Sequence, residues 1–448
     1  MNIFHSTKVE ESLFKNRIRT ILNLVRNRID GSEITILKST GITMNLRFGK
    51  IENIEFHNGS SLTVTVFNNN KTGTASSSDL SMNGIKKIIE GAISISKNTN
   101  SDPFSSLPEI ELLAFKMEKI DLFYPWIFEL DKVKNFLKLA EEAAFNFDKR
   151  IINTEGISFN ACITTKVFGN THNMIQAYHT SQYSLSSCVV AKDKFDMQRD
   201  YEYSYVRDMK EIQNPIWIGK KSAEKALSRL SPIKIKTIKS SVILNPDVAA
   251  SIFFHFSEAI KGINVYKNST FLLNYLGKKI FPHWLNIQED PNLKKGIASK
   301  PFDDEGVKTK FQYIIENGIL NTWLLNSYSG RRLGKLSTGN SGGIHNWKIC
   351  STLKLNFKEL LKMMNSGLLI TELLGSGTNL ITGDFSYGAV GFWVSNGEIQ
   401  YPVNEITISG NLKNLFLNIE GISNDDIDKR NSIQCGSVLV SNIQISGS

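Results

Sequence analysis

Cysteine is scarce in this 448-residue chain, and its four cysteines are far apart and form no Cys-x-x-Cys pair: Cys162, Cys188, Cys350 and Cys435. That spacing excludes a disulfide framework and favours reduced, structural thiols. Long apolar runs are also absent. No stretch approaches the roughly 20 residues that a membrane-spanning helix needs, and the first 29 residues lack the unbroken apolar segment of a signal peptide. We therefore expect a cytoplasmic protein without a membrane partner.

A basic block is absent as well, although the net charge is +9, from 52 Lys and Arg against 43 Asp and Glu. The basic residues are spread along the chain, and no nucleic-acid recognition motif accompanies them. Lys, Asn and Ile have AT-rich codons and are used heavily throughout, so compositional drift explains the charge better than a nucleic-acid ligand does. With 41% apolar and 21% charged residues, the chain is typical of a globular protein with two or three domains.

Three segments of the chain differ in their pattern. Residues 1–100 combine an amphipathic helix at 6–29 with three extended stretches and a second helix. Residues 101–235 begin with a polar linker and combine two helices with a Ser-, Thr- and Tyr-rich, β-like stretch at 155–208. Residues 236–448 are rich in strands and glycine corners. We expect one domain from each segment.

Asn-Gly pairs predict tight hairpins at residues 58–59, 317–318 and 396–397. The last two lie in the C-terminal segment, where repeated hairpins favour a largely antiparallel, curved or barrel-like domain. Helical and strand blocks alternate along the chain without the regularity of βαβ units. The sequence therefore predicts the α+β class.

One predicted helix calls for a test as a metal site. The stretch NPDVAASIFFHFSEAIKG begins at Asn245, a good N-cap, and places His255 three residues before Glu258. An HExxH zinc helix beginning at His255 needs Glu at 256 and His at 259, but the sequence has Phe256 and Ala259. Because catalytic zinc typically takes three protein ligands, a structural or partner-facing role for His255 fits better than metal ligation.

Other residues are weaker candidates for a groove or a cleft. Phe254 points away from the apolar stripe of the same helix, so we expect a second layer or a second subunit to cover it. The GNSGG motif around Ser341 fits the G-x-S-x-G pattern, but IHNWKI follows where a nucleophile elbow requires a helix. A glycine turn presenting backbone N–H groups, at a groove beside His345, is the better interpretation. Asp384 and Glu405 are candidates for carboxylates that line a groove. The alternative is that both side chains lie in loops and are exposed to solvent.

Several longer motifs resemble one known family. They are KRIINTEG, SLSSCVVA, STFLLNYLG, SKPFDDEGVKT, NGILNTWLLNSYSGRRLG, STGNSGGIHNW, GDFSYGAVGFWVSNGEIQYPVNEITISGN and IQCGSVLV. Together they resemble the PmbA (TldE) branch of the TldD/PmbA metallopeptidase family (U62-type), most of all its members from enteric bacteria. The resemblance implies an N-terminal α/β sandwich followed by a C-terminal domain of twisted antiparallel sheets that form a pseudo-barrel.

The family's zinc ligands do not carry over to this chain. In the TldD branch a helix carries HExxxH, and a cysteine near the C-terminus completes the zinc site. Those helix positions fall here at Phe253, Phe254 and Glu258, and the cysteine position falls near Asn424. A further departure is Tyr387 within GDFSYG, where close relatives usually have an arginine. We therefore expect that this chain contributes no metal ligand. We also expect that the basic contact to substrate, which an arginine would make, is missing at Tyr387.

The resemblance implies a cytoplasmic metalloprotease that degrades or processes small unfolded polypeptides, such as antitoxins and peptide-antibiotic precursors. A TldD-like partner would supply zinc and the catalytic glutamate, while this subunit would form one wall of the cavity and bind peptides along its groove edges by strand addition. Two alternatives stay open. The chain is a non-proteolytic peptide-binding or assembly protein, or it is a self-sufficient hydrolase that uses Ser341 or a cryptic metal site.

Overall fold

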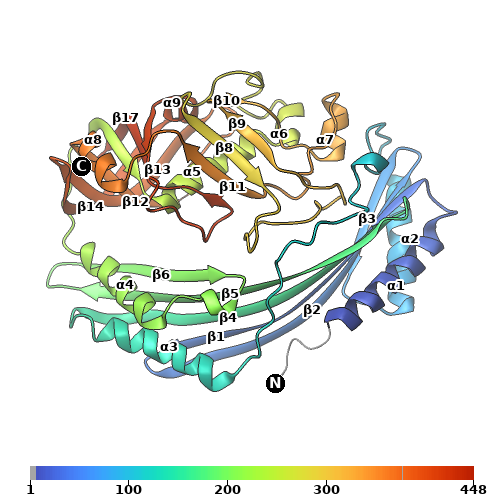
Figure 1. Ribbon diagram of the computed structural model, residues 1–448, viewed down its shortest axis with the longest axis horizontal. Helices are drawn as coiled ribbons and strands as arrows, with labels where there is room; N and C mark the ends of the chain where they lie inside the picture. The colour runs from blue at the N-terminus through green and yellow to red at the C-terminus, as the bar shows by residue number, and fades with distance from the viewer. Residues whose placement is uncertain (1–6, 376, 448) are drawn as a thin grey trace.

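In the computed structural model, which describes residues 7–375 and 377–447, a strongly curved sheet lies beneath a strand-rich C-terminal part (Figure 1). The curved sheet has six strands in the order β3-β2-β1-β4-β5-β6, and all neighbours are antiparallel. Its strands are β1 (Gly31–Arg47), β2 (Lys50–Asn68), β3 (Lys71–Ser77), β4 (Ile151–Asn170), β5 (Ile175–Lys192) and β6 (Met197–Val206). Because β1 pairs with β4, segments 1–100 and 101–235 share this one sheet.

Helices cover only the convex face of the curved sheet (Figure 1). They are α1 (Thr7–Val25), α2 (Met82–Asn98), α3 (Leu130–Phe145) and α4 (Pro215–Ser228). The strands alternate in burial, and side chains of β1 such as Ile34, Ile36, Ile42 and Met44 pack beneath these helices. The helices α3 and α4 cross closely at Gly219, where an added Cβ would lie 1.9 Å from the Ala140 carbonyl oxygen. The concave face is left to meet the C-terminal part.

The C-terminal part contains a closed ring of five strands. In this ring β14 pairs with β13, then β12, β7 and β17 follow, and β17 pairs with β14 again. The ring strands are β7 (Ile238–Leu244), β12 (Gly367–Leu374), β13 (Asp384–Ser395), β14 (Glu398–Asn411) and β17 (Val438–Ser446), and β15 (Ile419–Ile422) extends it beside β17. All pairs are antiparallel except β7 with β12. The expected α+β class with a barrel-like, mainly antiparallel C-terminal domain is confirmed.

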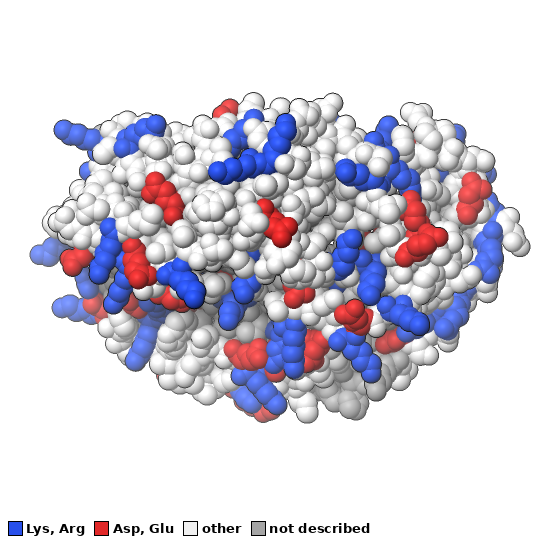
Figure 2. Space-filling view, turned by 45° about the horizontal axis from the view of Figure 1, so that its top comes forward, with Lys and Arg blue, Asp and Glu red and all other residues white. Residues whose placement is uncertain are grey.

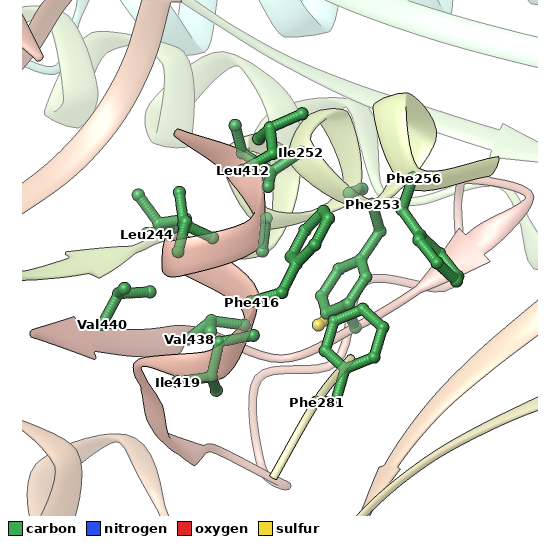
Figure 3. Close-up of a cluster of buried hydrophobic side chains, with 14 of the residues drawn as sticks. Leu244, Ile252, Phe253, Phe256, Phe281, Leu412, Phe416, Ile419, Val438 and Val440 are labelled. Atoms are coloured by element: carbon green, nitrogen blue, oxygen red, sulfur yellow. The ribbon is translucent and has the colours of Figure 1, made fainter. Parts of the chain in front are cut away.

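A second sheet packs against this ring in the order β10-β9-β8-β11-β16. Its strands are β8 (Leu285–Asp290), β9 (Gln312–Glu316), β10 (Ile319–Leu320), β11 (Asn346–Ser351) and β16 (Ile433–Gln434). The short helices of the C-terminal part are α6 (Gly262–Tyr266), α7 (Ser327–Arg332), α8 (Phe357–Met364) and α9 (Leu412–Leu417). The central helix α5 (Pro246–Ala259) inserts Phe253 and Phe256 among Phe281 and Phe416, as Figure 3 shows. This apolar core fixes the orientation of α5.

Two of the three predicted hairpins are confirmed, and one is wrong. The turns at residues 317–318 and 396–397 join β9 to β10 and β13 to β14, with positive φ at both residues of each turn. Residues 58–59 instead lie inside β2, paired with Thr40 and Ser39. The chain turns earlier, at Phe48 and Gly49, whose φ values are 49° and 70°. A long partner strand therefore overrides the local turn preference of Asn-Gly.

The surface and the helices add two observations. On the face shown in Figure 2, basic and acidic side chains are interspersed, and neither sign forms a continuous patch. Within the described ranges, every helix is too short or too polar to cross a membrane.

Candidate functional site

A cleft of about 540 Å³ lies between the curved sheet and the C-terminal part. One wall comes from β6, the edge strand of the curved sheet, and the opposite wall comes from α5, β12, β13 and the loop that precedes β16. Its lining includes Tyr201, Tyr203, Asp247, Phe254, His255 and Tyr387. The cleft thus joins residues from both parts of the fold and is the candidate functional site.

The helix α5 supplies the centre of this cleft. Its start is fixed by Asn245, whose side chain accepts a hydrogen bond of 2.9 Å from the backbone N–H of Val248, and by Pro246 in the first turn. One face of α5 is buried in the apolar core, and the other presents Asp247, Phe254 and His255 to the cleft. The Phe254 side chain is 49% exposed. The expected second layer is therefore not provided by the described part of this chain.

His255 and Tyr387 form a hydrogen bond across the cleft, with 2.7 Å between the imidazole Nε2 and the phenol oxygen. The same phenol oxygen bonds the Thr378 hydroxyl. Burial lowers the pKa of His255, so its imidazole is neutral at neutral pH. Tyr387 thereby adds a phenol to the wall of the cleft.

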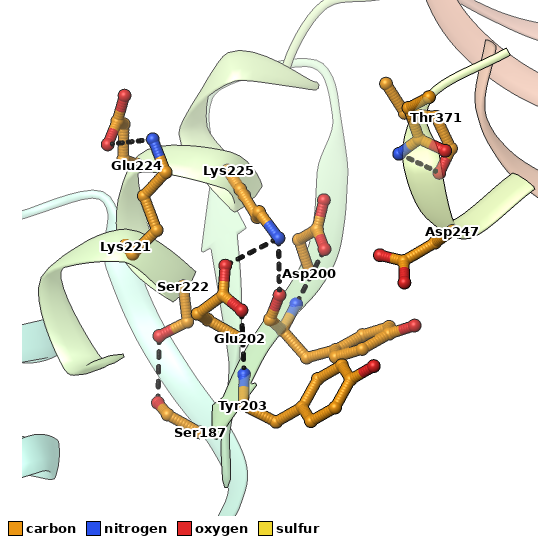
Figure 4. Close-up of polar contacts among 12 residues, drawn as sticks. Ser187, Asp200, Glu202, Tyr203, Lys221, Ser222, Glu224, Lys225, Asp247 and Thr371 are labelled. Atoms are coloured by element: carbon orange, nitrogen blue, oxygen red, sulfur yellow. Dashed lines mark hydrogen bonds and ion pairs between the residues drawn. The ribbon is translucent and has the colours of Figure 1, made fainter. Parts of the chain in front are cut away.

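The strand β6 divides its side chains between the two faces of the sheet. Tyr201 and Tyr203 line the cleft, with ring centroids 6.2 Å apart. Asp200 and Glu202 face α4, where the Glu202 carboxylate lies 2.8 Å from the Lys225 ammonium (Figure 4). Burial raises the pKa of both tyrosines, which keeps their phenols neutral. The alternation of YEYSY in the sequence therefore gives β6 one aromatic face and one ionic face.

At Tyr201 and Tyr203, the backbone N–H and C=O groups on the outer edge of β6 already have hydrogen-bond partners. The backbone N–H of Tyr201 donates to the Asp200 carboxylate at 2.7 Å. The backbone N–H of Tyr203 donates to the Glu202 carboxylate at 3.0 Å, as Figure 4 shows. The Tyr203 carbonyl accepts from Arg430 at 3.0 Å, and the Tyr201 carbonyl accepts from Lys225 at 3.4 Å. At this point of the groove, the expected strand addition has no open backbone partner, because charged side chains protect the edge.

A carboxylate pair lies at the end of the cleft nearest the start of α5. Burial is the main cause that raises the pKa of Asp247 to about 6, and the contact with Asp428 and its negative charge act in the same direction. Apart from its contact with Asp428, the Asp247 carboxylate makes two long contacts, 3.3 Å to the Asn431 amide and 3.6 Å to the Arg430 guanidinium. Arg430 is engaged more tightly by Asp428, at 2.9 Å. Asp247 therefore keeps acceptor capacity towards the cleft.

The residues that the resemblance places at the family's zinc positions do not fit a metal ion. Phe253 is buried in the apolar core, Phe254 offers only a phenyl ring, and the Glu258 carboxylate lies 2.5 Å from the Lys261 ammonium. Asn424, at the cysteine position, is exposed. Across residues 7–375 and 377–447, three or more His, Cys, Asp or Glu side chains are nowhere grouped so as to hold a metal ion. Zinc needs such nitrogen, sulfur or oxygen ligands.

The groove candidates from the sequence do not line this cleft. His345 is 2% exposed, and its imidazole Nε2 bonds the Gly339 carbonyl oxygen at 2.8 Å. Ser341 lies in a turn followed by β11 rather than by a helix, and its backbone N–H donates to Asp303. Asp384 and Glu405 are exposed, the latter paired with Lys234. The predicted groove beside His345 is instead a buried polar cluster.

Sequence reasoning did not single out Tyr201, Tyr203 or Asp247. The alternating aromatic residues of YEYSY were the available signal for the tyrosines, and Asp247 was visible only as a favourable first-turn residue of its helix. Only the docking of β6 against the start of α5 brings these residues together.

Comparison with known proteins shows the family to which this chain belongs. Residues 32–96 match the family model described as PmbA/TldA metallopeptidase domain 1, residues 123–230 match the central domain, and residues 237–447 match the C-terminal domain. These matches cover most of the chain, which belongs to the PmbA/TldD metallopeptidase family. The resemblance inferred from the motifs is thereby confirmed.

Individual relatives place the chain in the PmbA branch. It is 48% identical to metalloprotease PmbA of Escherichia coli O157:H7 over 447 residues, which cover 100% of this chain and 99% of that protein. It is 47% identical to the metalloprotease PmbA homolog of Buchnera aphidicola subsp. Acyrthosiphon pisum, with 100% of both chains covered. The structure of TldE from Thermococcus kodakarensis shares the fold, with a TM-score of 0.84 at 21% identity, covering 96% of this chain and 100% of that chain.

Proposed function

We propose that this chain is the PmbA/TldE-type subunit of a cytoplasmic metalloprotease that degrades or processes small unfolded polypeptides. Zinc and the catalytic glutamate come from a TldD-like partner subunit. This chain contributes a wall of the peptide-binding cavity through the cleft between β6 and α5. Membership of the metallopeptidase family supports the reaction class.

The observation that carries the proposal is the composition of the helix α5. It lies in the cleft, yet the three family zinc positions hold two phenylalanines and a glutamate that is paired with Lys261. The same helix presents Phe254 and the neutral His255 to the cleft. Aromatic and neutral polar side chains suit the binding of an extended peptide better than the activation of water.

The test compares this chain, a TldD-like chain and their mixture. We expect the purified chain to bind no stoichiometric zinc by elemental analysis and to leave an unfolded peptide intact. We expect the mixture to form a stable complex, to contain zinc and to cleave the peptide, with loss of activity after chelation. Zinc bound in a one-to-one ratio by this chain alone, together with cleavage, would contradict the proposal.

A variant sharpens this test. Glu258→Gln removes the only carboxylate at the family zinc positions of α5. We expect the mixture that contains this variant to cleave at the wild-type rate, because the water-activating glutamate belongs to the partner. A loss of cleavage with the complex intact would assign the catalytic carboxylate to this chain. Equal cleavage by the TldD-like chain without this subunit would instead favour a binding or assembly role.

The self-sufficient alternative is tested separately at the GNSGG turn. A hydrolase that used Ser341 would lose its activity in the Ser341→Ala variant of the pure chain. The geometry argues against this role, because the His345 imidazole bonds Gly339 and the turn leads into a strand. We expect the pure chain to be inactive with or without the substitution.

A further inference from the structure

We propose that the cleft between β6 and α5 is a subsite that binds a cationic group of the unfolded peptide, a lysine or arginine side chain. The inference rests on the proposed function for the peptide itself. It goes further by naming the chemistry that this subunit selects and the residues that select it: Tyr201, Tyr203 and Asp247.

The aromatic wall provides the first half of the argument. The faces of phenol rings attract cations within about 6 Å of the ring centroid. The chain already uses this property here, because the Arg430 guanidinium lies 4.1 Å from the centroid of the Tyr203 ring. Tyr201 stands beside Tyr203 with its ring tilted by 31° and is 44% exposed. The Tyr201 ring is therefore free to receive a cation from the peptide.

The acidic end of the cleft provides the second half. Asp247 lies among the lining residues, and beside Asp428 its contacts with donor groups are both long, so its carboxylate can accept a stronger hydrogen bond from a cation. The ion pairs behind this wall join five carboxylates to only three cations: Asp200, Glu202, Asp247, Glu372 and Asp428 with Lys225, Arg229 and Arg430. The excess of negative charge favours a positively charged guest.

The start of α5 does not turn the cleft into an anion site. Its first backbone N–H groups are partly capped by the Asn245 side chain, and Asp247 itself places a negative charge in the first turn. Main-chain recognition is also restricted, because side chains satisfy the edge of β6 at Tyr201 and Tyr203. At this point of the cleft, the protein therefore distinguishes peptides by their side chain rather than by their backbone.

The experiment measures binding rather than cleavage. Fluorescently labelled unfolded peptides that differ at one central residue, lysine, norleucine or glutamate, are titrated against the purified chain at neutral pH. We expect the lysine peptide to bind about ten-fold more tightly than the norleucine peptide, since a partly desolvated cation gains from both an aromatic face and a carboxylate. The glutamate peptide should bind most weakly. Equal affinity for all three peptides would overturn the proposal.

Three variants locate the effect. Asp247→Asn and Tyr201→Leu should each lower the ratio of the affinity for the lysine peptide to the affinity for the norleucine peptide. Asp384→Asn is the matched control, because it removes an exposed carboxylate outside the cleft. Circular dichroism checks that each variant is folded. A lysine preference that survives Asp247→Asn, or that Asp384→Asn abolishes, would place the subsite elsewhere and refute the assignment.

A pH series gives a second readout. Asp247 faces the tyrosines of β6, Lys225 of α4, His255 of its own helix, and Asp428 and Arg430 of the loop before β16. Its pKa is about 6, so the lysine preference should weaken as the pH falls through about 6, and the Asp247→Asn variant should lack that change.

The two proposals fail separately. If the mixture with a TldD-like chain cleaves peptides while this chain binds lysine and norleucine peptides alike, the subsite is wrong and the protease role stands. If this chain selects the lysine peptide but the mixture does not cleave, the protease role fails and the subsite stands.

Discussion

Replacement of Glu289 tests the interpretation of the buried polar cluster around His345. Glu289 on β8 is fully buried, and its carboxylate accepts hydrogen bonds from the Gln312 amide at 2.6 Å and the Asn340 amide at 3.0 Å. It also accepts from the backbone N–H of His345 and from the Trp347 indole, both at 2.9 Å. The carboxylate thereby joins β8, β9, β11 and the GNSGG turn.

Glu289→Ala should therefore be strongly destabilising. The two side-chain amides can reorient towards each other, but the His345 N–H and the Trp347 indole N–H are held by the backbone and the core and would lose their acceptor. A buried donor without an acceptor costs about 1–3 kcal/mol, and the vacated space adds a cavity cost. We expect a loss of about 4 kcal/mol in the free energy of unfolding. Glu289→Gln retains one carbonyl oxygen and should cost about half as much, roughly 2 kcal/mol.

Urea denaturation followed by circular dichroism and by tryptophan fluorescence measures both changes, provided that the m-value stays constant. The control is Glu420→Ala on β15, an exposed position that should change stability by less than about 0.5 kcal/mol. If Glu289→Ala unfolded at the wild-type urea concentration, or were more stable than Glu289→Gln, the cluster would not act as a structural unit. His345 would then return as a candidate functional residue.

Three further predictions concern packing, pH and thiol chemistry. Gly219→Ala should cost about 1–3 kcal/mol in urea denaturation because its Cβ meets the Ala140 carbonyl, whereas Gly59→Ala, with open space around it, should be tolerated. Burial raises the pKa of Asp303 to about 7, so between about pH 4 and 7 this carboxyl holds a proton in the folded state that it lacks in the unfolded state. The free energy of unfolding of the wild type, relative to that of Asp303→Asn, should therefore fall as the pH rises through this range. A flat difference would contradict that pKa. Cys435 is fully buried and burial raises its pKa, so iodoacetamide should modify it last, as mass spectrometry can follow; early labelling would place the thiol at the surface.

The sequence was sufficient for elements that depend on local signals. The helix α5 begins where Asn245 and Pro246 predict, and the Asn-Gly turns at 317–318 and 396–397 close hairpins. The Asn-Gly pair at 58–59 failed because the long pairing of β1 with β2 outweighs a preference of two residues. Register across a sheet is a non-local property, and a single sequence contains little direct information about it.

The site was predictable mainly by exclusion. The sequence shows directly that α5 lacks an HExxH motif. The cleft could not be predicted from the sequence, since it needs the aromatic face of β6 and the start of α5 to meet across the junction of two sheets. The prediction for His345 failed for a different reason: its glycine-rich surroundings suggest an open groove, but its side chain is buried and its backbone N–H donates to the buried Glu289.

The closed five-stranded ring has a consequence for how the protein is made. Its strand β7 is synthesised early in the C-terminal part but must lie between β12 and β17, and β17 closes the ring by pairing with both β7 and β14 (Figure 1). The curved sheet can form while the ribosome is still translating, because all of its strands precede α4. The ring stays open until β17 emerges, so a nascent chain arrested shortly before residue 438 would expose unpaired edges of β7 and β14 to chaperones and proteases.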